Sequence, residues 1–182
     1  MATLIRHLPF GEPRSHVEVG GRSVTVLPFQ AVVWVSIAPK GPEPFDPRTP
    51  RIPAVVDLGF NGTFAIREEQ LRDWAGVDPR LFPRLRRTRL RGAPTDARLA
   101  NLWLHPNVPR SRDASGRAPF RLELFKGIFV LGPPEHPGEG DHRPQLPLLG
   151  VYALHRANLR LIVDCGPCRL SIRTAPSFPF WG

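Results

Sequence analysis

Cysteine is nearly absent from this sequence of 182 residues, in which only Cys165 and Cys168 occur. The disulfide framework typical of small secreted domains is therefore excluded. Long apolar runs are missing too, since the longest, residues 31–35, is far too short to cross a bilayer. Residues 1–10 include Arg6 and Pro9 and contain no apolar stretch typical of a secretory signal. We therefore expect a cytoplasmic protein without a membrane partner.

Lysine is also scarce, although the chain is strongly basic. Lys40 and Lys126 are the only lysines among 25 basic residues, and the net charge is +9. A basic chain is typical of proteins with anionic partners. The arginines are spread over the whole sequence beside abundant proline and glycine, which is also typical of biased codon usage, so we do not expect a nucleic-acid partner.

The densest basic run covers residues 84–91, with five arginines at alternating or adjacent positions. In a strand, alternation directs Arg87, Arg89 and Arg91 to one face and Leu90 to the other. Three interpretations stay open: a solvated edge, a phosphate-binding stripe, or a surface that favours acidic substrates. A nucleic-acid-binding β-barrel that uses this run is the least favoured alternative for the whole chain.

Proline and glycine are frequent, with 23 and 16 copies, so segments must be short and turns numerous. This composition favours an all-β fold over a helical bundle. Alternating apolar residues predict a hairpin over residues 17–26 and strands over residues 31–38, 54–57, 63–66, 88–92, 98–105, 159–163 and 169–173. Residues 119–131 are predicted to form either a strand pair or one long bent strand, with a break at Lys126 and Gly127. Short helices are predicted over residues 67–75 and 152–157, and loops over residues 40–53 and 132–147.

The most informative segment is residues 54–62, which read Ala-Val-Val-Asp-Leu-Gly-Phe-Asn-Gly. Here an apolar strand ends in a carboxylate, Asp57, followed by a loop that contains two glycines. A carboxylate in such a place is unfavourable unless it is hydrogen-bonded or paired. Asp57 is therefore either a residue kept for chemistry or a loop cap that accepts the amides of Gly59 or Phe60.

Two motifs in the sequence match the order of motifs in a known family. The first is Asp57-Leu58-Gly59 after an apolar strand, followed by Phe60 and a second glycine, Gly62. The second is the segment Leu148-Leu149-Gly150, which precedes a predicted helix and a predicted hairpin. In this order the chain resembles the retropepsin-like aspartic peptidases, which include retroviral proteases and small bacterial relatives, and the resemblance covers about residues 17–175.

The resemblance implies an all-β fold, a retropepsin-like closed β-barrel with one or two short helices, which forms a two-fold homodimer. It divides the chain into an N-terminal tail (residues 1–15), a peptidase domain (16–175, with an insertion within 106–147) and a C-terminal tail (176–182). The implied activity is that of an aspartic endopeptidase that hydrolyses polypeptides. Neither a cofactor nor a metal is expected.

The implied site has one catalytic carboxylate per subunit, Asp57, supported by Leu58 and Gly59. Two carboxylates that share one proton activate a water in this chemistry, so the partner subunit supplies the second Asp57. A hairpin flap that closes over the substrate is placed at residues 88–105, with its tip near Pro94 and Thr95. The expected substrate-binding residues are Phe60, Asn61, Gly62, Ala93, Pro94, Thr95, Leu149 and Gly150.

Leu58 departs from the family pattern, which has Thr or Ser after the catalytic Asp. Its side chain lacks the hydroxyl that bonds the partner's loop, and each lost hydrogen bond costs about 1 kcal/mol. Leu58 can instead pack against its copy at the two-fold axis. The alternative function is therefore a catalytically weak or inactive module of the same fold that serves in dimerisation or peptide binding.

Two further sequence patterns resemble functional sites, but their context favours a structural role. Cys165-Gly166-Pro167-Cys168 spells the thioredoxin tetrapeptide, but an alternating strand follows it, so we expect a turn between two strands. His136 and His142 flank acidic residues in the proline-rich loop, where a solvated segment is favoured over a metal site. His105 and His155 are expected to be structural or surface groups.

Overall fold

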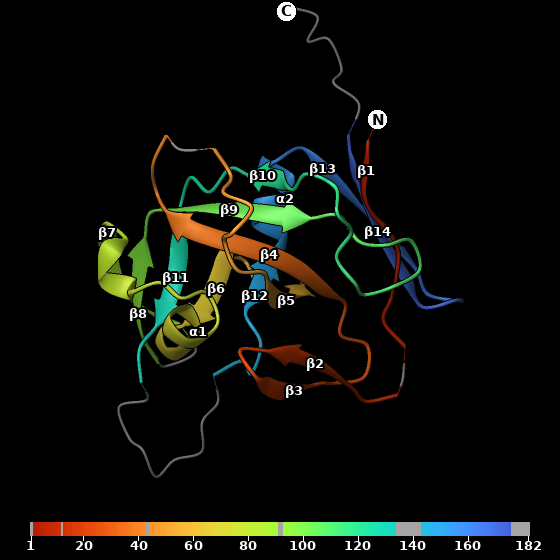
Figure 1. Cartoon of the computed structure of the whole chain (residues 1–182), viewed down its shortest axis with the longest axis horizontal. Coiled ribbons are helices and arrows are strands. Elements are labelled where there is room, and N and C mark those ends of the chain that lie inside the picture. Colours follow the sequence, from red (N-terminus) through yellow and green to blue (C-terminus); the bar gives the residue numbers. More distant parts are fainter. Residues whose placement is uncertain (1, 12, 43, 91–92, 134–142, 176–182) are drawn as a thin grey trace, which may run out of the picture.

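The computed structural model describes residues 2–11, 13–42, 44–90, 93–133 and 143–175. Strands dominate it, as the proline- and glycine-rich composition predicts, and only short helices interrupt them. The strands form one large sheet, a three-stranded sheet beside it and a separate hairpin below it (Figure 1).

The large sheet has nine strands among the described residues, and β10 and β7 form its two ends. In spatial order they are β10 (Phe120–Leu122), β9 (Ala100–His105), β4 (Val32–Pro39), β5 (Ile52–Asp57), β12 (Leu148–Gly150), β6 (Phe64–Arg67), β11 (Ile128–Leu131), β8 (Ala93–Arg98) and β7 (Arg84–Leu90). The end strands do not pair with each other within this part of the chain, so the sheet is open where the sequence predicted a closed barrel.

The order of strands in the middle of this sheet differs from their order in the chain. β12 lies between β5 and β6, and it runs parallel to β5 and antiparallel to β6. β11 likewise pairs in parallel with β6. The strands β5, β6 and β12 are buried almost throughout, which explains why they read as apolar runs without alternation.

The second sheet contains β1 (Thr3–Pro9), β14 (Arg169–Thr174) and β13 (Leu159–Asp164), with β14 in the middle. Residues 1–15 were expected to be a tail, and that prediction is wrong for residues 3–9. Leu4, Ile5 and Leu8 of β1 are buried, and the strand pairs antiparallel with β14. The amide of Ala2 also donates to the Thr174 hydroxyl at 2.8 Å, so both ends of the described chain lie side by side. Residues 176–182, the expected C-terminal tail, lie outside the described residues.

Two predicted turns are confirmed. The hairpin of β2 (Ser15–Val19) and β3 (Arg22–Val26) turns at Gly20 and Gly21, both of which have positive φ. The β13–β14 hairpin turns at Cys165–Cys168, where the amide of Cys168 donates to the carbonyl of Cys165 at 3.4 Å. Cys165 is exposed and neither cysteine forms a disulfide.

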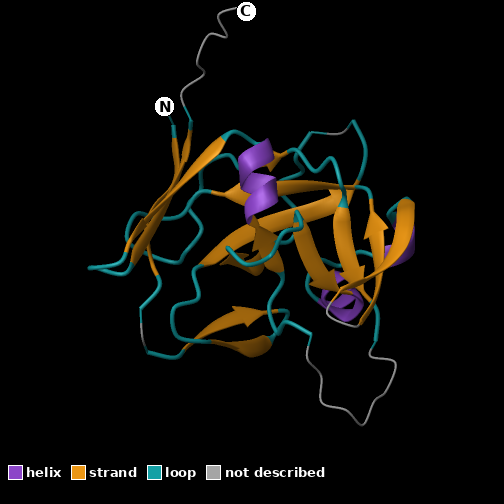
Figure 2. Cartoon of the chain, turned by 180° about the vertical axis from the view of Figure 1, so that it is seen from behind, coloured by secondary structure: helices purple, strands orange, loops and turns teal. Residues whose placement is uncertain are grey.

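Helices α1 (Glu68–Asp73) and α2 (Val151–Arg156) match the predicted helices to within two residues, and a short 3₁₀ helix, η1, covers Pro79–Leu81. Gln70 accepts the amide of Arg67 at 3.0 Å and so caps the start of α1. Helix α2 follows β12 directly and lies against the large sheet on the side facing the viewer in Figure 2. No helix of the described chain is both long and apolar enough to span a bilayer.

The hairpin expected to turn near Pro94 and Thr95 is placed differently in the structure. β8 begins at Ala93, Leu90 pairs with Ala93, and Thr95 is a buried residue in the strand. The connection therefore falls between Leu90 and Ala93. Pro94 fits in the strand because it faces Arg89 on one side, while its carbonyl accepts the amide of Gly132 at 2.9 Å on the other.

Candidate active site

Asp57 is the last residue of strand β5 and lies at the edge of the apolar interior. Every residue of β5 before Asp57 is buried, whereas Asp57 itself is half-buried and Leu58 and Gly59 are exposed. The Asp57 Oδ1 atom accepts the amide of Gly59 at 2.9 Å, and the Asp57 carbonyl accepts the amide of Phe60 at 3.3 Å. The predicted capping interaction is thus present, and it fixes the direction of the carboxylate.

The second motif lies directly beside the first. Gly150 of β12 is the register partner of Asp57, and its amide donates to the carbonyl of Thr63 at 3.0 Å. A Cβ atom added to Gly150 would lie 2.1 Å from the carbonyl oxygen of Gly62. Only glycine permits this approach, although φ at Gly150 is an ordinary −83°. The packing of β12 therefore holds both ends of the Asp57 loop.

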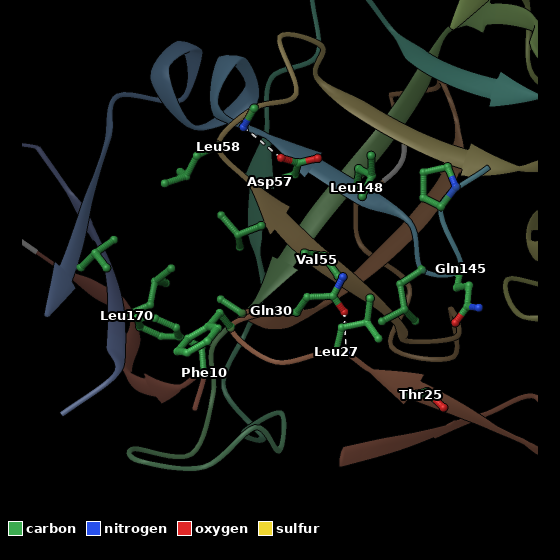
Figure 3. Close-up of a pocket in the computed structure, with 17 residues that line it drawn as sticks. Phe10, Thr25, Leu27, Gln30, Val55, Asp57, Leu58, Gln145, Leu148 and Leu170 are labelled. Carbon is green, nitrogen blue, oxygen red and sulfur yellow. Dashed lines mark hydrogen bonds between the residues drawn. The ribbon is translucent and has the colours of Figure 1, made fainter. Parts of the chain in front are cut away.

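Asp57 opens onto a cavity of about 510 Å³, which is large enough for a peptide side chain or a small ligand. Figure 3 shows Asp57 and Leu58 at one side of it, Phe10 and Leu170 at another, and Gln145 on a third. The lining consists of Phe10, Thr25, Leu27, Phe29, Gln30, Ala31, Val55, Val56, Asp57, Leu58, Gly59, Pro144, Gln145, Leu146, Leu148, Val163 and Leu170. Among the described residues that line the cavity, Asp57 is the only one with an acidic or basic side chain.

The rim of the cavity is unusually apolar for an exposed surface. Leu58 and Phe29 are each 58% exposed, Leu27 is 47% exposed and Val163 is 41% exposed. These residues come from three separated parts of the chain but line one cavity. A gathered apolar surface of this kind is typical of a surface that another molecule covers.

One wall of the cavity is held in place by α1. The Gln70 side chain donates to the carbonyl of Gln145 at 2.8 Å, and the guanidinium of Arg67 donates to the carbonyl of Pro144 at 2.7 Å. Arg143 forms an ion pair with Glu69 at 3.0 Å. Helix α1 and the preceding Arg67 therefore position residues 143–145, which the sequence did not connect with the site.

Several residues expected at the site lie elsewhere. Phe60 is buried and packs edge-on against Phe129, with ring centroids 6.1 Å apart, and Leu149 is fully buried in the main core. Asn61 is exposed and Gly62 is buried beneath the loop. Ala93, Pro94 and Thr95 are not among the residues that line the Asp57 cavity. The structure thus brings Asp57, Leu58 and Gly59 together with Leu148 at the cavity. Gly150 lies beside Asp57 on β12 and Asn61 is exposed in the loop, whereas the remaining expected residues lie in the core or on β8.

Residues that sequence reasoning missed include Phe10, Phe29 and Val163, which lie far apart in the chain and carry no motif. Within the described ranges, no cluster of three or more histidine, cysteine or acidic side chains is placed to hold a metal. His136 and His142, weighed above as metal ligands, lie outside those ranges.

His105 forms a buried polar pair with Ser36, away from the cavity. The two side chains are almost fully buried, and the Ser36 hydroxyl lies 2.8 Å from His105 Nε2 and 2.9 Å from the carbonyl of Pro50. Because that hydroxyl donates to Pro50, it accepts from His105, so the ring proton lies on Nε2. Burial, together with the nearby charge of Arg51, lowers the pKa of His105 to about 4. The interpretation of His105 as a structural group agrees with this position.

The chain was also compared with known proteins. No protein-family model and no curated protein matches it.

Proposed function

We propose that this protein is a homodimeric, retropepsin-like aspartic endopeptidase with Asp57 of each subunit as its catalytic pair. The observation that carries the proposal is the insertion of β12 between β5 and β6, with Gly150 in register with Asp57. This arrangement joins the two motifs on which the family resemblance rests. It also leaves a half-buried carboxylate at the edge of a cavity of about 510 Å³.

The chemistry requires two carboxylates that share one proton. Two carboxyl groups in contact cannot both ionise without a large penalty in free energy, so one of them stays protonated. The ionised one takes a proton from a water, which attacks the scissile carbonyl, and the protonated one stabilises the developing oxyanion. The Gly59 amide at 2.9 Å from Oδ1 orients Asp57 for this role.

A second copy of the chain is needed because the cavity lining contains one carboxylate. The apolar rim of Leu27, Phe29, Leu58 and Val163 supports such a contact, since a dimer removes these side chains from water. Strand β13 supports it as well. It is one of the two outer strands of its sheet in the described chain, and Ile162 and Val163 are exposed on it.

The flap of such an enzyme is assigned here to the β7–β8 hairpin. Leu90 and Ala93, which flank the connection, pack against the cluster that contains Phe60 and Leu131. The end of the hairpin therefore lies on the same side of the molecule as the Asp57 loop.

The test is the Asp57→Asn variant, which keeps an acceptor for the Gly59 amide but removes the carboxylate. Wild-type protein should cleave members of a broad peptide library at acidic pH, and we expect Asp57→Asn to reduce the rate at least about a hundredfold. The matched control is Asp113→Asn, because Asp113 is exposed and, among the described residues, its carboxylate accepts a hydrogen bond only from the nearby Ser111. Equal cleavage by wild-type protein and Asp57→Asn contradicts the proposal.

A second candidate is a non-catalytic peptide-binding or dimerisation module, and Leu58 favours it. A leucine at this position cannot form the hydrogen bond that holds the two catalytic loops together, and poorly held groups lose catalytic geometry. The Leu58→Thr variant separates the two candidates. Activity that appears only in Leu58→Thr supports the non-catalytic module, whereas activity in the wild-type protein excludes it.

A further inference from the structure

A second cavity, of about 440 Å³, lies at the β7 end of the large sheet and is lined mainly by β7 and β8. Its charged lining residues are Arg84, Arg87, Asp96, Arg98 and Glu68. None of them lines the Asp57 cavity. The two cavities are therefore separate sites.

A β-bulge brings two of these arginines to the same face. Arg84 pairs with Arg98, and Arg87 pairs with Asp96, with a shift of register between Arg84 and Arg86. Arg98 and Asp96 are two residues apart on β8 and so share a face. Arg84 and Arg87 are three residues apart and share that face only because the bulge adds one residue. Bulges of this kind commonly redirect side chains at functional sites.

The charges around the cavity do not cancel. Arg98 neutralises Asp96 through a contact of 2.6 Å, and Arg72 forms an ion pair with Glu68 one helical turn away. Arg84 and Arg87 remain at 3.9 and 3.8 Å from the same Asp96 carboxylate, too far for a hydrogen bond. Two positive charges are thus in excess, and their donors are unused by the described residues.

We propose that this cavity binds a phosphate dianion, either as free phosphate or as a phosphate monoester. Two guanidinium groups match the charge of a dianion, and their planar donor sets suit the oxygens of a phosphate. A single carboxylate would leave one charge unmatched. The volume leaves room beside the anion for the group esterified to it.

The site is tested by isothermal titration of the full chain with inorganic phosphate and with phenyl phosphate at fixed ionic strength. Both ligands should bind saturably, and Arg84→Gln and Arg87→Gln should each weaken binding about tenfold. The matched control is Arg86→Gln. It removes the same charge from the same strand, but Arg86 pairs with the buried Ala97 and so lies on the other face. Tighter binding of phenyl phosphate identifies a monoester as the ligand, and equal binding identifies free phosphate.

Three outcomes overturn the proposal. The first is the absence of saturable binding of either phosphate. The second is equal weakening by Arg86→Gln, which indicates general attraction to a basic strand. The third is stronger binding of a single-stranded oligonucleotide that depends equally on Arg84, Arg86 and Arg87, which indicates a nucleic-acid surface. Because Arg84 and Arg87 are exposed, their variants should retain the wild-type melting temperature, and Asp57→Asn should bind phosphate normally.

Discussion

The buried pair of His105 and Ser36 should make this protein sensitive to mild acid. In the native state, His105 is neutral, its Nε2 proton is donated to Ser36, and its Nδ1 atom is buried without a partner among the described residues. A second proton on the ring would have to sit on Nδ1, where no acceptor receives it. Protonation therefore favours the unfolded chain.

The size of the effect follows from the pKa of His105, which falls from 6.5 in the unfolded chain to about 4 in the native protein. The unfolded state takes up the proton first as the pH falls. Stability is thus complete above pH 6.5, declines as the pH drops through that value and levels off near pH 4. At about 1.4 kcal/mol per pH unit, the loss is about 2 kcal/mol at pH 5 and about 3 kcal/mol below pH 4.

The assay is urea unfolding between pH 7 and pH 4 for wild-type protein and the His105→Gln variant. Glutamine places an N–H donor near the position of Nε2, so the contact with Ser36 is kept while the titration is removed. Other groups titrate equally in both proteins, so the difference between the two pH profiles isolates His105. His155→Gln is the control, because His155 is exposed.

A His105→Gln profile that parallels the wild-type profile between pH 7 and pH 5 refutes this reasoning. If the two profiles instead diverge, the activity and the stability of the proposed peptidase respond to pH in opposite directions. Its catalytic chemistry is favoured by acidic pH, whereas its folded state is destabilised by it. His105→Gln should then extend the lower pH limit of activity without changing the Asp57 chemistry.

Three further outcomes are expected. Gly150→Ala should destabilise the protein by about 3 kcal/mol in chemical denaturation, because its Cβ would lie 2.1 Å from the Gly62 carbonyl oxygen; an unchanged midpoint would show that the loop yields. Deletion of residues 1–9 should cost about 5 kcal/mol or more by removing the buried side chains of β1, and a deletion variant with wild-type stability would show that β1 is dispensable. A thiol-specific reagent should modify the exposed Cys165 faster than the half-buried Cys168, as peptide mapping by mass spectrometry would reveal; equal rates would contradict the arrangement of this turn.

The parts of the fold that depend on local chemistry were predictable from the sequence. Gly20 and Gly21 mark a turn because both adopt positive φ, and the helix at residues 68–73 follows from its acidic first turn and its stop at Gly76. The break near Lys126 also coincides with a positive φ at Gly127. In each case the residues that determine the structure are neighbours in the chain.

The parts that depend on distant partners were not predictable. The apolar residues of β1 do not alternate regularly along the sequence. In the structure, His7 adopts a φ of 50° and the pairing with β14 shifts register twice. The segment at Pro94 resembles a turn, but Pro94 lies within β8, where its carbonyl accepts the amide of Gly132 from a part of the chain that is distant in sequence. At the site, Asp57 was identifiable from its context, whereas Phe29 and Val163 join the cavity only through the tertiary fold.

The placement of β12 between β5 and β6 means that the Asp57 loop cannot fold until β12 has been synthesised. During synthesis, β5 and β6 are complete long before residues 148–150 leave the ribosome, and until then the two strands lack the partner that lies between them. Contacts over such a separation form slowly. The Asp57 loop therefore becomes ordered only after residues 148–150 have been made, and a shorter nascent chain carries the Asp57 motif without its geometry.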